Sequence, residues 1–267
     1  MVKNSAAQTF RALHASNDIL LLPNAWDAGT ARLIAQAGAK AIATTSAGVA
    51  WALGYPDGDT VPEAALLGAI DAIARVTNVP LSVDLEGGYS TDAQAVAALA
   101  CELAERGVAG INIEDGTSAP DLLVAKIEAI RSELRKRDAD LFINARTDVY
   151  LLSLREGDAA LTEAIARAKA YEAAGADGFF VPYLTDLQAM HALASASSLA
   201  LNVLAVPDLP ALADLQRNGI RRVSAGSSIA VLAYGTAVSA SKQFLKDATL
   251  GPRPEHALNY ANINALF

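Results

Sequence analysis

A repeated phrase constrains the fold of this chain more than any other feature of its sequence. A helical pattern ends in glycine and a short apolar run follows it, four times along the chain. The four copies are Ala37–Ile42, Arg106–Ile111, Ala174–Phe179 and Asn218–Val223. Glycine just past a helix favours the left-handed conformation that closes the last turn, and the run after it favours a strand. The first three glycines are 69 and 68 residues apart, which fits one repeat of two strand–helix units.

The intervals between these copies complete a pattern of alternating strands and helices. Eight strands are predicted: Ile19–Leu22, Ala41–Thr45, Leu81–Leu85, Gly110–Glu114, Leu141–Ala145, Gly178–Val181, Leu199–Leu204 and Arg222–Ala225. Helical patterns between them include Pro62–Val76, Thr91–Arg106, Pro120–Arg137 and Ala159–Ala174. Strict alternation predicts a parallel sheet, and eight units predict a closed α/β barrel, the (β/α)8 or TIM barrel.

Length and composition fit one domain. The chain has 267 residues, of which 52% are hydrophobic, and single α/β barrels routinely reach this size. No linker or low-complexity tract divides the sequence. We therefore expect a single barrel domain over residues 1–267, with a short helical tail from about Pro252.

Charge and cysteine content exclude several classes of protein. The chain carries 21 basic and 29 acidic residues, a net charge of −8, so no basic stripe is available to bind nucleic acid. The single cysteine, Cys101, cannot form an internal disulfide. The first residues lack an apolar signal core, and no apolar run is long enough to span a bilayer. We expect a cytoplasmic protein with neither nucleic-acid nor membrane partners.

Polar side chains gather where the predicted strands end. Period-two alternation puts Asp84 and Glu86 on one face of the third strand, and Asn112 and Glu114 on one face of the fourth. The fifth strand places Asn144 and Arg146 in the same way, the second strand delivers Ser46, and Asp57 follows in the loop 54–58. Barrel active sites form at the carboxyl ends of the strands, so these residues are the candidates for a site.

Four of these candidates are carboxylates. Asp57, Asp84, Glu86 and Glu114 would repel one another at one mouth unless a metal or an arginine lay between them. An all-oxygen ligand set without histidine suits Mg²⁺ or Mn²⁺. The alternative is that each acid caps a helix or pairs with an arginine at a loop.

Other catalytic classes lack the residues that they need. The three histidines, His14, His191 and His256, lie in helical or terminal patterns, so neither a serine–histidine–aspartate triad nor a histidine-bound zinc is supported. No lysine stands at the carboxyl end of a predicted strand, which removes the nucleophile of a Schiff-base aldolase. Cys101 lies in mid-helix among alanines and leucines. The catalytic class that remains is electrophilic catalysis, in which a metal ion assists a reaction of an anionic substrate.

At these positions the sequence resembles the phosphoenolpyruvate mutase/isocitrate lyase superfamily, from about Leu20 to about Ser228. The segments that carry the resemblance are Leu22–Ala28, Thr44–Gly48, Gly54–Asp57, Val83–Tyr89, Ile113–Asp115 and Asn144–Asp148. Together, in this order and at this spacing, they form a specific signal. The resemblance implies a barrel that binds a small 2-oxo acid, or its enolate, on Mg²⁺.

The resemblance also implies roles for individual residues. Asp84 resembles the direct metal ligand, and Asp57, Glu86 and Glu114 resemble the acids that hold the waters of the metal. Ser46 and the amides of Ala47 and Gly48 resemble the pocket for the substrate carboxylate, and Arg146 resembles the arginine that clamps the substrate. Members of the superfamily tend to form tetramers in which dimers exchange the last barrel helix, which implies a homodimer or homotetramer here.

Two departures narrow the implied chemistry. The Lys-(Lys/Arg)-Cys-Gly-His stretch that supplies the catalytic cysteine of the lyases and the gating loop of the mutases are both missing from the short segment Glu114–Pro120. After the sixth strand, where many lyases have Pro-Glu, this chain has Pro182-Tyr183. These features fit members that decarboxylate, hydrolyse or otherwise cleave simple 2-oxo acids.

We therefore expect a Mg²⁺-dependent, lyase-type enzyme that cleaves a carbon–carbon bond of a small 2-oxo carboxylate through a metal-stabilised enolate. The candidate catalytic residues are Ser46, Asp57, Arg146 and Tyr183, and the candidate substrate contacts are Trp26, Ser46, Ala47, Gly48, Arg146 and Asn202. Tyr183, Thr117, Asn202 or a metal-bound water could donate the proton. The alternatives are phosphorus–carbon chemistry on phosphoenolpyruvate or phosphonopyruvate, and a non-catalytic binder of 2-oxo acids.

Overall fold

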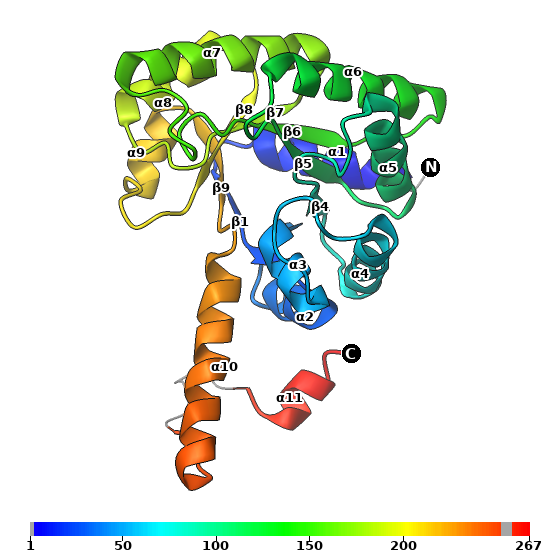
Figure 1. Ribbon diagram of the computed structural model, residues 1–267, viewed down its shortest axis with the longest axis vertical. Helices are drawn as coiled ribbons and strands as arrows, with labels where there is room; N and C mark the ends of the chain where they lie inside the picture. Colours follow the sequence, from blue (N-terminus) through cyan, green and yellow to red (C-terminus); the bar gives the residue numbers. More distant parts are fainter. Residues whose placement is uncertain (1–2, 252–257) are drawn as a thin grey trace.

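A computed structural model describes residues 3–251 and 258–267 and shows a parallel barrel with helices around it (Figure 1). Nine strands form one sheet in the order β1-β9-β8-β7-β6-β5-β4-β3-β2. The first two, β1 (Leu20–Leu22) and β2 (Asn24–Ala25), stand at opposite ends of this order and are separated in sequence only by Pro23. They act as one barrel strand that is interrupted where proline offers no N–H to a ladder. The predicted TIM barrel is confirmed.

The remaining strands lie within two residues of their predicted bounds. They are β3 (Ile42–Thr44), β4 (Leu81–Asp84), β5 (Gly110–Glu114), β6 (Phe142–Arg146), β7 (Gly178–Phe180), β8 (Ala200–Leu204) and β9 (Ile220–Ser224). Neighbouring strands are parallel throughout, and their register aligns Asp84 with Asn112 and Glu114 with Arg146. The register therefore places Asp84, Asn112 and Asn144 at one level of the barrel, with Glu114 and Arg146 two residues nearer its carboxyl end.

Helices follow the strands and cover the outside of the barrel. They are α2 (Ala28–Gln36), α3 (Ser46–Leu53), α4 (Glu63–Val76), α5 (Ala93–Glu105), α6 (Pro120–Lys136), α7 (Gly157–Ala174), α8 (Leu187–Ala196) and α9 (Leu212–Arg217). In α4 the residues Leu66, Leu67, Ile70 and Ile73 form the buried stripe, at the spacing of an amphipathic helix. Cys101 is buried in α5 among the alanines and leucines of that helix. The short helix α3 was not predicted.

The amino end of the barrel is closed by α1 (Lys3–Ala15). Phe10 packs there against Leu22 and Phe142, in a small cluster separate from the main core beneath the helices. His14 stacks on the Phe142 ring at a centroid distance of 4.1 Å. This apolar plug leaves the opposite, carboxyl end of the barrel as the open one.

The last long helix does not pack along the barrel. Helix α10 (Ser228–Asp247) extends away from the other helices, and α11 (Tyr260–Asn264) follows it (Figure 1). The predicted terminal helix is thus present, whereas the expected boundary at Pro252 lies outside the described residues. Among the described helices, none combines the length and the apolar character needed to cross a membrane.

Candidate active site

A cavity of about 240 Å³ opens at the carboxyl end of the barrel. Six of the predicted site residues line it: Ser46, Ala47, Asp57, Asp84, Arg146 and Tyr183. They come from the last residues of β4 and β6 and from the segments that follow β3 and β7. The apolar side chains of Leu151, Phe180 and Leu204 complete the wall. Parallel strands therefore gather into one small volume residues that are spread over more than a hundred positions of the sequence.

Asp84, the last residue of β4, carries an unsatisfied acceptor. Its Oδ2 accepts a hydrogen bond from the backbone N–H of Ser46 at 3.3 Å, whereas its Oδ1 is buried and has no partner. Burial raises the pKa of Asp84, and the nearby positive charge of Arg146 opposes that shift. A buried carboxylate oxygen without a donor is costly, so this atom is suited to a cation.

Arg146 lies between two carboxylates. Its Nη1 is 2.6 Å from Oε2 of Glu114, the residue beside it on β5. Its Nε and Nη2 donate to the two oxygens of Asp148 at 2.6 and 3.0 Å, a bidentate pair. The pKa of Arg146 is raised by the charges of Glu114 and Asp148, against the effect of burial. Of its five N–H groups, two remain for a substrate.

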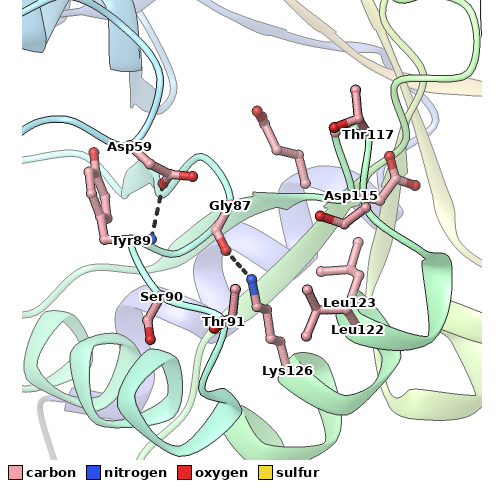
Figure 2. A pocket seen from close by; sticks show the side chains of 13 residues that line it. Asp59, Gly87, Tyr89, Ser90, Thr91, Asp115, Thr117, Leu122, Leu123 and Lys126 are labelled. Atoms are coloured by element: carbon pink, nitrogen blue, oxygen red, sulfur yellow. Dashed lines mark hydrogen bonds between the residues drawn. The ribbon is translucent and has the colours of Figure 1, made fainter.

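Glu114 pairs with Arg146 and lines a second, outer cavity. Burial is the main cause that raises the pKa of Glu114 to about 8; the charge of Arg146 lowers it, and Asp84 and Asp148 add to the rise. The outer cavity, of about 420 Å³, lies between the segments that follow β4 and β5. Figure 2 shows this outer cavity with Asp59, Tyr89 and Thr117 around it and with Lys126 donating to the carbonyl of Gly87 at 2.6 Å.

Glu86 holds a neighbouring loop in place. Its Oε2 accepts the backbone N–H groups of Gly58, at 2.8 Å, and of Asp59. Its Oε1 accepts the hydroxyl of Tyr89 at 2.7 Å. Both oxygens are thus in use, and Glu86 lines neither of the two cavities. Its bonds fix the loop that carries Asp57.

In this structure the four predicted acids, Asp57, Asp84, Glu86 and Glu114, do not surround a single point at which a metal ion could bind. Asp57 and Asp84 line the inner cavity, Glu114 lines the outer one, and Glu86 points into the loop. Within residues 3–251 and 258–267 no group of three acidic, histidine or cysteine side chains is placed to hold a metal ion. The unpartnered Oδ1 of Asp84 and the oxygen-only donor set nevertheless fit a hard cation.

The segment after β3 forms a backbone cradle beside Asp84. A Cβ on Gly48 would lie 2.7 Å from Cγ2 of Thr45 and 2.8 Å from Cβ of Trp26, so glycine is required there. Trp26 is buried behind the cradle and does not line the cavity. Ser46 and Ala47 do face the cavity. Trp26 thus supports the segment from behind.

Tyr183 and Asn202 differ in position. Tyr183 lies at the rim of the cavity, 54% exposed, with a φ of +64°. A non-glycine residue in this conformation is strained and is often found at functional sites. Asn202 is fully buried inside the barrel, where its Oδ1 accepts from Asn144 and Ser224, and it does not reach the cavity. Thr117 lines the outer cavity.

Three residues near the site were not assigned a role from the sequence. Asp148 pairs with Arg146, Lys126 lies beside the outer cavity, and Arg222 is buried below the inner one. The alternation along the last strand carried a signal for Arg222, because it places Arg222 and Ser224 on the inward face. Lys126 lies in the middle of a helix, and nothing in its sequence neighbourhood indicates a site.

Comparison with known proteins identifies the family. Residues 10–245 match the phosphoenolpyruvate phosphomutase family. The chain belongs to this family. A crystal structure of a Burkholderia cenocepacia J2315 protein is 40% identical, with a TM-score of 0.84 over 90% of this chain and 100% of that one.

Two enzymes of assigned activity are similar to this chain. The oxaloacetate decarboxylase of Paraburkholderia xenovorans (strain LB400) is 30% identical over 223 residues, covering 79% of this chain and 72% of its own. The 2-methylisocitrate lyase of Escherichia coli (strain K12) is 33% identical over 199 residues, covering 70% and 65%. These relatives confirm the prediction of a lyase-like enzyme of the phosphoenolpyruvate mutase/isocitrate lyase superfamily.

Proposed function

We propose that the protein cleaves a carbon–carbon bond of a small 2-oxo carboxylate with the help of Mg²⁺ or Mn²⁺. One observation carries the proposal: the unpartnered oxygen of Asp84 lies beside Arg146 and the Ser46 cradle in a cavity of about 240 Å³. A 2-oxo acid that chelates a metal needs a ligand for the cation, hydrogen-bond donors for its carboxylate and a rigid backbone around it. Asp84, Arg146 and the Ser46 cradle could supply these in turn. The similarity to an oxaloacetate decarboxylase supports the same substrate class.

The residues that would hold the metal are Asp84 directly, with Asp57 in the same cavity and Glu114 next to it around its waters. Glu86 would contribute through the loop that it fixes, which carries Asp57. A cation there would relieve the repulsion that contributes to the raised pKa of Glu114. When bound, the metal supplies Lewis-acid stabilisation of the negative oxygen that develops on the keto group.

The protein's own groups orient the substrate. The Ser46 hydroxyl and the amides of Ala47 and Gly48 would bind the substrate carboxylate, as backbone donors bind anions at the start of a helix. Arg146 would use its two remaining N–H groups, held in plane by its bidentate pair with Asp148. Leu151 and Phe180 limit the space left for water. A cavity of this size favours short acids.

Tyr183 is the proton donor that we favour. It lines the cavity at its open rim, where a phenol can exchange its proton with solvent. Thr117 belongs to the outer cavity and Asn202 to the barrel interior, so both are less suitable.

The test is pyruvate release from a panel of 2-oxo acids, measured with Mg²⁺ and with a chelator. The panel contains oxaloacetate, 4-hydroxy-2-oxo acids with short alkyl tails, and phosphonopyruvate, because these compounds leave pyruvate when they lose CO2, an aldehyde or, with water, phosphate. The expected result is Mg²⁺-dependent cleavage of a carbon–carbon bond in at least one of the 2-oxo acids. Turnover of phosphonopyruvate alone would favour the phosphorus–carbon chemistry to which the family match also points. Binding without turnover of any member would show a 2-oxo acid binder instead.

We further propose that α10 is exchanged between two copies of the chain. Beside the first strand a groove of about 640 Å³ is lined by apolar residues of β1, α2 and β9, including Leu21, which is 54% exposed. A closed barrel places a helix over this face. Helix α10 leaves Val231, Leu232 and Val238 exposed. The α10 of a second copy would fit the groove.

A further inference from the structure

Arg222 is a fully buried cation that the proposed mechanism does not use. It lies on β9, and no part of it is exposed; it is the largest of the described side chains that are less than 2% exposed. Its neighbour Val223 packs into the main core under the helices. Because successive side chains of a strand point to opposite faces, Arg222 and Ser224 point into the barrel.

The guanidinium of Arg222 has only neutral partners. Its Nε donates to Oγ of Ser224 at 2.9 Å, and its Nη2 donates to Oδ1 of Asn112 at 3.2 Å. Its Nη1 is buried and has no partner. In the part of the chain that the structure describes, no carboxylate lies within ion-pair distance of it. Arg146 and Arg167, by contrast, each contact two acids.

Arg222 lies directly under the inner cavity. Both of its partners, Asn112 and Ser224, line that cavity. The sheet register places Asn112 beside Asp84. The pKa of Arg222 is lowered to about 9 by burial, while the charge of Asp84 raises it, so the two groups are within electrostatic reach.

A network of hydrogen bonds fixes this position. Asn144 donates to Oδ1 of Asn112 at 2.9 Å and to Oδ1 of Asn202 at 3.1 Å. Ser224 donates to the same oxygen of Asn202 at 3.2 Å, which closes a ring through Arg222. Such networks hold a group in a defined place, but these neutral groups do not offset its charge. A buried charge without a counter-ion is unfavourable for folding.

We propose that Arg222 is a positioning residue whose charge, held beneath the cavity floor, favours a small carboxylate anion above it and opposes a metal cation that binds at Asp84 alone. The inference rests on the proposed function and extends it. Arg146 is already offset by Glu114 and Asp148, so Arg222 supplies the uncompensated positive charge of the site. Metal and 2-oxo acid would therefore bind well only together.

The test compares ligand affinities and stability in matched variants. Calorimetry measures the Kd of Mg²⁺ alone, and then of oxalate in saturating Mg²⁺, for the wild type, Arg222→Met and Arg222→Lys. Oxalate is a planar dianion with the oxygen spacing of a 2-oxo acid enolate. Arg131→Met is the control, because Arg131 is a part-buried arginine that pairs with Asp177 and donates to Gly175 at the other end of the barrel. Thermal unfolding of the four metal-free proteins completes the set.

In Arg222→Met the affinities for Mg²⁺ and for oxalate are expected to change in opposite directions. Its Mg²⁺ affinity should rise and its oxalate affinity should fall, each on the order of tenfold. Its Tm should hold or rise, because an unpaired buried charge is replaced by an apolar chain of similar length. Arg222→Lys should bind oxalate more like the wild type. Arg131→Met should bind both ligands normally and unfold at a lower temperature.

Several outcomes would overturn the inference. One is that the affinities of Arg222→Met for Mg²⁺ and oxalate change in the same direction or do not change. Another is that the Tm of Arg222→Met falls as far as that of Arg131→Met. A third is that neither the wild type nor Arg222→Met binds Mg²⁺. If the wild type binds Mg²⁺ but not oxalate, the proposed function fails, and the Mg²⁺ titration of Arg222→Met still decides the role of Arg222.

Discussion

At the scale of single residues, the candidate site depends on two side chains of opposite charge. Asp84 has a buried oxygen without a donor, and Arg146 has two N–H groups left after it pairs with Glu114 and Asp148. One is suited to a cation and the other to an anion. Substitution of each should therefore affect a different ligand.

Asp84→Asn should abolish metal binding and leave the fold intact. The amide keeps the size of the carboxylate but loses the charge that a hard cation requires. Since burial raises the pKa of Asp84, its charged form is unfavourable in the folded protein, and the metal-free variant should unfold at an equal or higher temperature. Calorimetric titration with Mg²⁺ and a thermal melt check both expectations. A large fall in Tm would show that Asp84 is structural.

Arg146→Lys should separate substrate binding from metal binding. Lysine keeps the positive charge but cannot reproduce two parallel hydrogen bonds to a carboxylate. We expect a loss of oxo-acid affinity of about 2–3 kcal/mol, a tenfold to hundredfold effect. Mg²⁺ affinity should hardly change, because arginine is not a ligand. Oxaloacetate titrations in saturating Mg²⁺ on both proteins measure the effect, and equal affinities would remove Arg146 from the substrate site.

At the scale of elements, two segments lead to predictions: the strained turn after β4, and helix α1, which carries the buried His14. The turn has positive φ values at Glu86 (+52°), Gly88 (+94°) and Tyr89 (+58°). Two of these are non-glycine residues, which such a conformation disfavours. Contacts from outside the turn must therefore hold it, and the amine of Lys126 on the Gly87 carbonyl is one of them (Figure 2).

Lys126→Met should loosen this turn. The variant loses the 2.6 Å bond to the Gly87 carbonyl. Faster hydrogen exchange at residues 87–89 is expected, with a few-fold loss of Mg²⁺ affinity, because Glu86 is then held less firmly. Lys136→Met is the control, since Lys136 is an exposed lysine of the same helix that pairs with Glu133. Unchanged exchange in Lys126→Met would show that the turn is stable without this bond.

Helix α1 should make stability depend on pH through His14. Burial lowers its pKa to about 3, and the charges of Arg222 and Arg11 act in the same direction. The unfolded chain binds a proton at His14 below about pH 6.5 and the folded chain does not until about pH 3, so stability falls as the pH falls through this window.

His14→Phe tests this dependence, because a phenylalanine ring can stack on Phe142 without titrating. Between pH 7 and pH 5 the wild type should lose about 2 kcal/mol more unfolding free energy than the variant. Urea unfolding at both pH values measures the difference. Parallel pH profiles for the two proteins would contradict a neutral buried His14.

At the scale of the whole molecule, the barrel brings the site residues together, and α10 extends outward. The apolar groove beside β1 is therefore left without a covering helix. The strands β3, β4, β6 and β7 bring Ser46, Asp84, Arg146 and Tyr183 to one mouth. Helix α10 starts next to this mouth, where Tyr234 meets the Trp26 ring at 6.0 Å. Its later residues extend away from the barrel (Figure 1). An apolar helix of this length is not expected to stay exposed in solution.

Leu232→Glu should disrupt the assembly of the protein. Leu232 is 70% exposed on α10, and a carboxylate there would be buried in the groove of a second copy. We expect light scattering to show a dimer or larger assembly for the wild type and a smaller species for the variant. Lys242→Glu changes an exposed polar position of the same helix and should keep the wild-type mass. A monomeric wild type would contradict helix exchange.

The sequence by itself determined the alternation of strands and helices, because glycine after a helix and apolar runs are local signals that act over a few residues. It also determined which polar residues stand at the strand ends, since the two-residue period of a strand fixes the face of each side chain. Ser46, Asp84 and Arg146 could be found together for this reason. Asp57 and Tyr183 lie in loops, and they were indicated by their place after a predicted strand and by the family resemblance.

Only the tertiary structure decided the pairing within that mouth. Glu86 and Glu114 follow the same alternation as Asp84, yet one is taken up by the amides of Gly58 and Asp59 and the other by Arg146. Asn202 and Arg222 follow it too, but their depth along the barrel axis leaves them below the cavity. These outcomes depend on sheet register, barrel closure and loop path, which join residues far apart in the chain and leave no local trace in the sequence.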